Sequence, residues 1–131
     1  MREFMLLIRN EGDPKASFTP ERQRQFLKAC EAYIGELKSG GKLLSAQPLM
    51  RDGRMISGTP AAFCDSAYAE GTEIIVGYYH IRANDLAEAI AIAKGNPEFA
   101  FHAKAKVEVR PIKTVEPSTS YVYSTESAPQ R

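Results

Sequence analysis

The sequence predicts an α+β domain in which a strand–helix–strand unit occurs twice. Strand-like apolar runs alternate with two segments of helical periodicity, and capping residues mark the ends of both helical segments. With 131 residues, 44% of them hydrophobic, the chain is long enough for one domain with its own core. We expect this domain to span residues 1–112 and to be followed by a C-terminal tail, 113–131.

The first strand and the first helix have the clearest patterns. "REFMLLIR" is a short apolar run that predicts a strand over residues 3–9. Thr19 supplies an N-cap and Pro20 a first helical residue, while Gly40 and Gly41 follow the last position of helical spacing. The apolar positions of this predicted helix are Phe26, Cys30, Tyr33, Ile34 and Leu37.

The middle of the chain predicts a strand, a tight turn and a loop. "KLLSAQPL" has the composition of a strand, and "LMRDGRMI" predicts a hairpin that turns at Asp52 and Gly53, a pair suited to the positive φ of a type I′ turn. "SGTPAAFCDSAYAEG" is rich in turn-forming residues, so we expect a loop over residues 57–71.

The second half repeats the strand–helix–strand order. "TEIIVGYYHI" predicts a strand, Asn84 the N-cap of a second helix, and "GNP" (95–97) its end. "KAKVEVRPI" predicts a last strand with one valine-rich face and one charged face. The complete order, with the extra hairpin, is that of a ferredoxin-like βαββαβ sandwich, which places both helices on one face of an antiparallel sheet.

One helical layer can cover only one face of such a sheet. The first strand and "IIVGYYHI" carry apolar or aromatic residues on both faces, so the second face needs another cover. We expect a second copy of the chain to supply it. The resulting homodimer would be a dimeric α+β barrel with a cavity between two sheets.

Charge and cysteine content exclude several classes of partner and cofactor. The 17 basic and 16 acidic side chains alternate along the chain, so neither nucleic acid nor an anionic membrane surface is an expected partner. The apolar run at residues 4–8 is too short for a signal peptide or a membrane span, and we expect a cytoplasmic protein.

Cys30 and Cys64 lack a CxxC pattern and predict reduced thiols. The spacing of the histidines supports no metal site, and no nucleotide or other cofactor motif occurs.

The candidate site lies in "GYYHIR". Strand alternation places Val76, Tyr78, His80 and Arg82 on one face, opposite the more apolar set of Ile75, Gly77, Tyr79 and Ile81, and we assign the His80 face to the dimer cavity. An imidazole, a phenol and a guanidinium together are suited to general acid–base catalysis on an anionic or carbonyl substrate. The alternative is a histidine that only hydrogen-bonds across strands or at the dimer seam.

His102, the second histidine, should lie toward the opposite end of the sheet from His80 and is predicted to be a solvated loop residue.

The stretch "CDSAYAEGTEIIVGYYHIRANDLAEAIAIAKGNPEF", with the later "VEVRPI", resembles the YCII-related or DGPF proteins of bacteria over about residues 4–112. The motif of that family is Asp-Gly-Pro-Phe followed by Ala or Asn and then Glu, and here Asp65, Tyr68 and Glu70 stand at matching places, with Ser66 and Ala67 replacing Gly-Pro. The resemblance implies the dimeric ferredoxin-like fold but no settled reaction. A histidine near the first helix, discussed in some relatives as half of a His-Asp pair, has no counterpart here.

These observations leave two main hypotheses for function. The first is a metal-independent lyase- or isomerase-like enzyme in which His80 is the acid or base and Asp65, whose loop leads into the strand, orients it. Tyr78, Arg82 and Tyr68 are then the ligand-binding residues. The second is a non-catalytic small-ligand-binding or regulatory dimer that uses the same cavity, and a weaker third is a structural assembly unit with a filled cavity.

The tail is Ser-, Thr- and Pro-rich and is either flexible or docked on the domain or the partner subunit.

Overall fold

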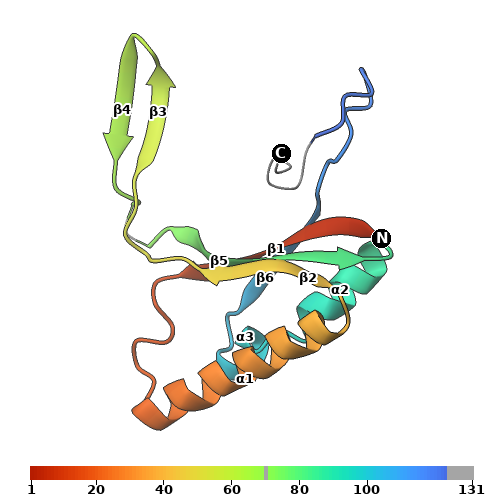
Figure 1. Ribbon diagram of the computed structural model, residues 1–131. Helices are drawn as coiled ribbons and strands as arrows, with labels where there is room; N and C mark the ends of the chain where they lie inside the picture. The colour runs from red at the N-terminus through yellow and green to blue at the C-terminus, as the bar shows by residue number, and fades with distance from the viewer. Residues whose placement is uncertain (70, 124–131) are drawn as a thin grey trace, which may run out of the picture.

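The computed structural model describes residues 1–69 and 71–123, and it consists of a four-stranded sheet with helices on one face only. Figure 1 shows α1 and α2 below the sheet, and a two-stranded hairpin and residues 113–123 above it. The elements in chain order are β1 (Arg2–Glu11), α1 (Pro20–Ser39), β2 (Leu43–Pro48), β3 (Met55–Thr59), β4 (Ala62–Ser66), β5 (Glu73–Ala83), α2 (Leu86–Lys94), α3 (Glu98–Phe101) and β6 (Lys106–Pro111).

The strand order of the main sheet is β2-β5-β1-β6, and every neighbouring pair is antiparallel. β1 and β5, the two central strands, each precede a helix that leads to an edge strand. This is the order of two interleaved βαβ units, so the predicted α+β class and its ferredoxin-like topology agree with the structure. The dimeric barrel stays a prediction at this point.

The core lies between the sheet and the helices. Alternate residues of β1 are buried, with Phe4 and Leu6 fully inaccessible, and Tyr79 and Ile81 of β5 join them. The cluster is completed by Ile8, Leu37, Ala83, Ala89 and Ala93. The prediction that Tyr79 and Ile81 face the helices is therefore confirmed, and Tyr78 and His80 lie on the opposite face.

A bulge in β5 changes the predicted face of two residues. Ile8 pairs with Gly77 and Arg9 with Ile75, so Val76 is the extra residue between them. Val76 packs against the core cluster, whereas Ile75, which the alternation pattern placed beside Tyr79, is 37% exposed. Simple alternation fails here because the bulge shifts the register by one residue.

Side-chain caps fix the first residues of α1 and α2. Thr19 Oγ1 accepts a hydrogen bond from the Arg22 amide at 3.1 Å, and Pro20 begins α1 as predicted. For α2 the N-cap is Asp85, not Asn84: Asp85 Oδ1 accepts from the amide of Glu88, and the Glu88 carboxylate accepts from the amide of Asn84. The arrangement differs from a capping box in one bond, because the Glu88 carboxylate accepts from the amide of Asn84, the residue before the cap, and not from the amide of the cap itself.

The predicted hairpin was placed too early in the chain. Asp52 and Gly53 lie in the connection between β2 and β3, and the turn joins β3 to β4 inside the segment 57–71 that was expected to be a loop. Gly58 explains the difference, because it adopts φ +108° and a Cβ at this position would lie 2.2 Å from the carbonyl oxygen of Ala62. Only glycine fits there, so the strand pairing depends on a single residue without a side chain.

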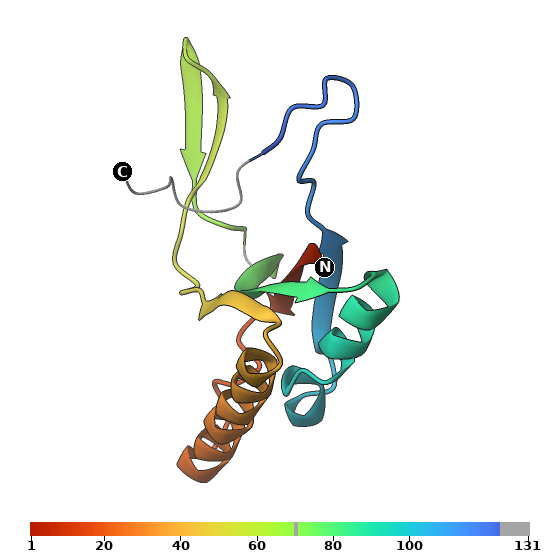
Figure 2. The ribbon, with the colours of Figure 1, turned by 45° about the vertical axis from the view of Figure 1, so that its right-hand side comes forward.

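The tail forms a small hairpin of its own. The amide of Ile112 donates a hydrogen bond to the backbone carbonyl of Glu3 in β1. Beyond Ile112, Val115 forms an antiparallel bridge with Val122, and the rings of Tyr121 and Tyr123 contact each other. In Figures 1 and 2 this segment rises from the side of the sheet away from the helices, and residues 113–123 add no strand to the main sheet. Residues 124–131 and Glu70 lie outside the described residues, and docking of the tail on a partner subunit stays a prediction.

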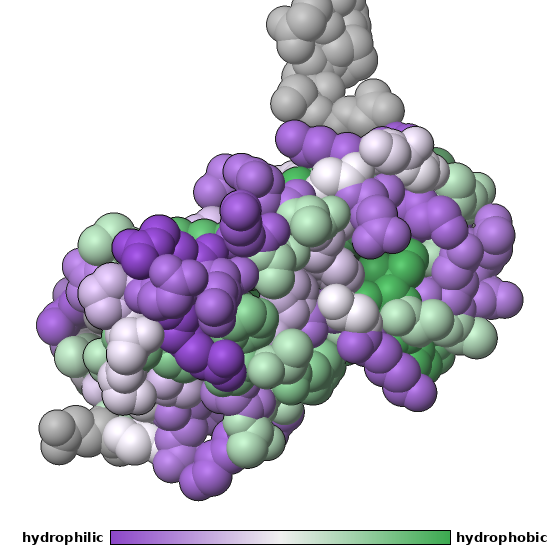
Figure 3. All heavy atoms as spheres, turned by 90° about the horizontal axis from the view of Figure 1, so that it is seen from below, coloured by the Kyte–Doolittle hydropathy of each residue, from purple (hydrophilic) through white to green (hydrophobic). Residues whose placement is uncertain are grey.

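Seen from the side of the helices, the surface is a mixture of polar and apolar residues (Figure 3). Leu27 of α1 and Ile90 of α2 are among the exposed large apolar side chains. Within residues 1–69 and 71–123, no helix has the length and apolar character needed to cross a membrane.

The first prediction concerns the core. Leu6→Ala removes a fully buried side chain and should lower the free energy of unfolding by about 2–5 kcal/mol, measured by urea denaturation. Leu27→Ala is the matched control, because Leu27 is 55% exposed on α1 and its loss should have little effect. Equal losses in the two variants would contradict the described core.

Candidate functional site

The face of the sheet without helices, which we call the open face, carries most of the polar side chains of the sheet. Each strand contributes alternate residues to it. In the central row Ser45, His80, Met5 and Arg110 lie side by side, and in the next row Gln47, Tyr78, Leu7 and Glu108. Apolar and titratable groups are therefore mixed on one surface.

His80 is held by a carboxylate from the neighbouring strand. Its Nε2 lies 2.7 Å from Oε1 of Glu3, and both side chains are 18% exposed. Met5 is the direct cross-strand partner of His80 and Arg82 that of Glu3, so Glu3 and His80 are diagonal neighbours. A carboxylate accepts hydrogen bonds, so Nε2 carries the proton and Nδ1 is the basic atom of the neutral ring.

Asp65 does not contact His80. Its carboxylate accepts a hydrogen bond from Arg54 Nε at 2.8 Å across the β3–β4 hairpin, and both side chains are 58% exposed. The hairpin stands away from the sheet, so the loop that leads into β5 does not bring Asp65 to the imidazole (Figure 2). Glu3 was not among the predicted site residues, although strand alternation places it on the face of Met5. Its contact with His80 follows from the pairing of β1 with β5, which the sequence does not show.

The other predicted residues divide into two groups. Tyr78 shares the face of His80, and its hydroxyl lies 3.3 Å from Oγ of Ser45. Arg82 is exposed and stands opposite Glu3. Tyr68 is separate, because its ring lies against Gly53 at the base of the hairpin, where a Cβ on Gly53 would come within 2.9 Å of the phenol oxygen. The structure thus brings together His80, Tyr78 and Arg82 but not Tyr68.

Ion pairs occupy the far end of the open face. Arg9 binds Glu73 at 2.8 Å and Glu108 at 3.0 Å, and Lys106 also binds Glu73. The hydrogen bond from Arg9, followed by that from Lys106, holds the pKa of the Glu73 carboxyl below its usual value. These groups are already matched in charge, so this end is less suited to bind a substrate than the end with His80.

The side chain of His102 is largely buried, contrary to the prediction of a solvated loop residue. Its Nε2 lies 2.8 Å from Oε1 of Glu98, and both side chains are only 9% exposed. It lines a pocket with Asn10, near the end of β1 away from Met5 and His80, so the two histidines do not form a pair. In the described part of the chain, no group of three or more His, Cys, Asp or Glu residues is placed to hold a metal ion.

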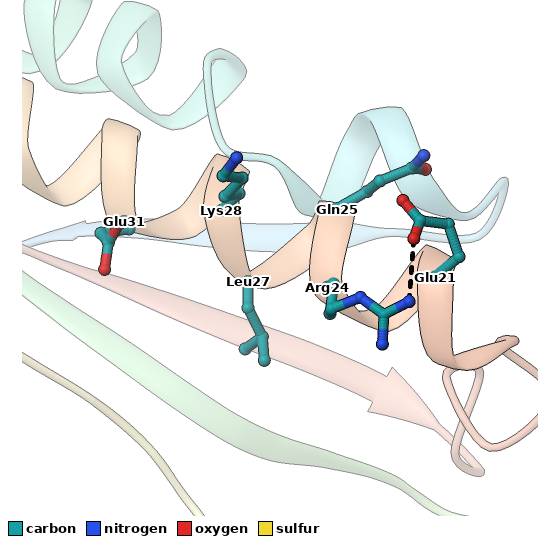
Figure 4. Close-up of a pocket in the computed structure, with 6 residues that line it drawn as sticks. All are labelled: Glu21, Arg24, Gln25, Leu27, Lys28 and Glu31. Atoms are coloured by element: carbon teal, nitrogen blue, oxygen red, sulfur yellow. Dashed lines mark hydrogen bonds and ion pairs between the residues drawn. The ribbon is translucent and has the colours of Figure 1, made fainter.

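A larger depression lies on the outer surface of α1, and Figure 4 shows it to be a solvated helix face. Its volume is about 440 Å³, and the side chains that line it all come from this one helix. Glu21 and Arg24 form an ion pair of 2.9 Å with both side chains about two-thirds exposed. Such a pair needs no ligand to explain it.

The topology and the open face together define a ferredoxin-like α+β domain with a titratable sheet surface. The family model of the YCII-related domain matches residues 3–114, so the chain belongs to the YCII-related family, as its resemblance to that family led us to expect. A comparison with curated proteins gave no match.

The second prediction uses the two thiols. Burial, and then the charge of Glu98, raises the pKa of Cys30 to about 11, while Cys64 is exposed on β4. The thiolate is the reactive form, so iodoacetamide at pH 8 should alkylate Cys64 about tenfold or more faster than Cys30, as followed by mass spectrometry. The rate at Cys30 should rise as the pH approaches 11. Cys64→Ser should remove the fast reaction, and equal rates at pH 8 in the native protein would contradict the burial of Cys30.

Proposed function

We propose that the chain is a metal-independent enzyme of the lyase or isomerase type that acts on a small carbonyl or anionic compound at the open face. The observation that supports this most directly is the 2.7 Å contact between His80 and Glu3. A histidine oriented by a carboxylate on a partly desolvated surface has the arrangement of a general acid or base. Glu3 takes the orienting role that the sequence analysis had given to Asp65.

The neighbouring groups suit the same chemistry. In the proposed reaction Nδ1 of His80 takes a proton from the carbon next to a carbonyl, and the electron pair moves onto the carbonyl oxygen. The hydroxyl of Tyr78, positioned beside Ser45, donates a hydrogen bond to that oxygen. Arg82 binds a carboxylate of the substrate. Return of the proton to another carbon gives an isomerase, and loss of a leaving group gives a lyase.

A second copy of the chain forms the other wall of the site in this proposal. Met5, Leu7 and Tyr78 are half-buried on the open face, and among the described residues no helix covers them. The β3–β4 hairpin exposes Ile56 and Phe63 on the same side of the sheet. Polar and apolar groups alternate on this face, which favours a wet cavity over a dry interface. The free thiols agree with a reducing compartment, and a cytoplasmic location is part of the proposal.

The third prediction tests the catalytic role. A panel of small keto acids, hydroxy acids and phenols is screened by NMR for ligands that shift the ring signals of His80 and for turnover of those ligands. His80→Gln should lower the turnover of a substrate about 10²- to 10⁴-fold. Glu3→Gln should lower it less and should leave KM nearly unchanged, because Glu3 acts through the imidazole. His80→Gln also assigns the His80 signals.

The outcomes separate the two hypotheses. Binding with turnover that depends on His80 supports the enzyme. Saturable binding at the open face without turnover of any ligand supports the ligand-binding or regulatory dimer instead. Turnover that is unchanged in His80→Gln, or the absence of any response at His80, would overturn the proposed site.

The fourth prediction concerns the homodimer. Leu7→Glu places a charge at the centre of the open face and should convert a dimer to a monomer in light scattering coupled to size-exclusion chromatography. Leu27→Glu makes the same chemical change on the outer surface of α1 and should leave the dimer intact. A native protein that is monomeric throughout the accessible concentration range would contradict the proposed cavity.

A further inference from the structure

Two arms rise on the side of the open face and carry most of the exposed large apolar side chains. Residues 49–69, which contain the β3–β4 hairpin, are called the hairpin arm, and residues 113–123 are called the tail arm. Figures 1 and 2 show both arms on the side of the sheet away from the helices. Of the 17 large apolar side chains exposed among the described residues, six lie in the hairpin arm and four in the tail arm. Exposed apolar surface is thus concentrated on one side of the molecule.

The hairpin has one face on which its large apolar side chains gather. Ile56 pairs with Asp65 and Gly58 pairs with Phe63, so Ile56 and Phe63 lie on the same face of the two strands. Phe63 is 67% exposed, and Gly58 opposite it has no side chain to cover the ring. Apart from Met55, the other face carries only small side chains. We call the face of Ile56 and Phe63 the apolar face of the hairpin.

The hairpin lacks cover from its own domain. Within residues 1–69 and 71–123, β3 and β4 form a sheet only with each other, and every residue of both strands is exposed. A hairpin of two strands is at best marginally stable in water unless it packs on something else. This one stands away from its own sheet (Figure 2). The apolar face therefore indicates contact with another chain.

The positions of the arms favour a second copy of this chain as the partner. The hairpin arm leaves the sheet beyond the pair of Pro48 with Gly77, and the tail arm leaves it beyond the pair of Pro111 with Phe4. β2 and β6 are the two edge strands, so the arms flank the open face at opposite edges. A body that covers the open face meets both arms. In a twofold dimer each subunit presents this same surface to the other, and one contact covers all of it.

Size and charge agree with such a contact. The ten exposed side chains of the arms present on the order of 1,000 Å² of surface, more than the roughly 800 Å² that each partner buries in a standard interface. Each arm also contains an ion pair of its own, Arg54 with Asp65 at 2.8 Å and Lys113 with Glu116 at 3.5 Å. A charge that is already paired repels its symmetry-related copy less than a lone charge does. Two like surfaces can therefore meet.

We propose that the hairpin arm of each subunit packs its apolar face on a second copy of the chain, on the side of that copy that carries the open face and the arms. Ile56 and Phe63 are the anchors of this contact. The inference rests on the homodimer of the proposed function and names the contact that holds it together. Each subunit then covers the hairpin of the other, and both His80 sites lie between the two sheets.

The first test is photo-cross-linking of the purified full chain. The photoreactive p-benzoylphenylalanine replaces Phe63 or, as the matched control, Phe99, which is 45% exposed on α3 on the helix side of the sheet. Irradiation of the first variant should give a product of twice the 14.5 kDa mass of the chain. Peptide mapping should find the attachment in β1, β5, β6 or the arms. The Phe99 variant should give no such product.

The second test measures how much the apolar face contributes. Ile56→Ser and Leu27→Ser remove side chains of equal exposure, 55%, from the hairpin arm and from α1. Ile56→Ser should raise the dissociation constant of the dimer at least about tenfold in sedimentation equilibrium, and Leu27→Ser should leave it unchanged. Both side chains are exposed, so neither change should unfold the domain.

The outcomes separate this contact from the homodimer itself. A dimer in which position 63 gives no product of twice the chain mass, or attaches to α1 or α2 of the second copy, would overturn the arm contact and leave the homodimer standing. Equal effects of Ile56→Ser and Leu27→Ser would do the same. A native chain that is monomeric would overturn both proposals. If such a monomer attached through position 63 to a different protein of a cell extract, the apolar face would belong to that partner instead.

Discussion

The structure depends on one constraint: within residues 1–69 and 71–123, the helices all lie on the same face of a four-stranded sheet. Burial of Phe4, Leu6 and Ile81 against α1 and α2 uses that face as the core and leaves the other face with a mixture of apolar and titratable groups. Because a strand alternates between faces, the residues that stabilise the fold and the residues available for chemistry occupy successive positions of the same strands. Tyr79 in the core next to Tyr78 and His80 on the open face is the clearest case.

The two histidine–glutamate pairs have similar hydrogen-bond geometry but different surroundings. His80 and His102 each place Nε2 within 2.7–2.8 Å of a glutamate oxygen. The pair with Glu3 lies on the open face with both side chains 18% exposed, so a substrate or a second subunit can approach it. The pair with Glu98 is more deeply buried, and the Lys15 ammonium offsets the charge of the carboxylate. The exposure of the first pair fits the acid–base role proposed for His80, whereas the second pair is part of a largely buried cluster with Lys15.

Local sequence signals predicted elements well where one segment contains all the necessary interactions. α1 begins at Pro20 and ends before Gly40 as expected, because its caps and its apolar stripe lie within a single stretch of chain. The β3–β4 hairpin was misplaced because an Asp-Gly pair resembled a turn, while the actual pairing depends on the backbone of Gly58 passing close to Ala62. The predicted faces of Ile75 and Val76 were wrong for a related reason, because a bulge arises from the pairing of two strands and cannot be seen in one strand alone.

The sequence by itself determined the α+β class, the strand–helix order, the membership in the YCII-related family and the side of β5 on which Tyr78 and His80 lie. These features follow from periodicity, capping and motif, which are local. Only the tertiary structure decided that Glu3, 77 residues away in the chain, is the partner of His80, that Asp65 is bound to Arg54, and that His102 is buried against Glu98. Each of these contacts depends on the register between distant strands or on the packing of a loop, and such geometry is set by the whole fold.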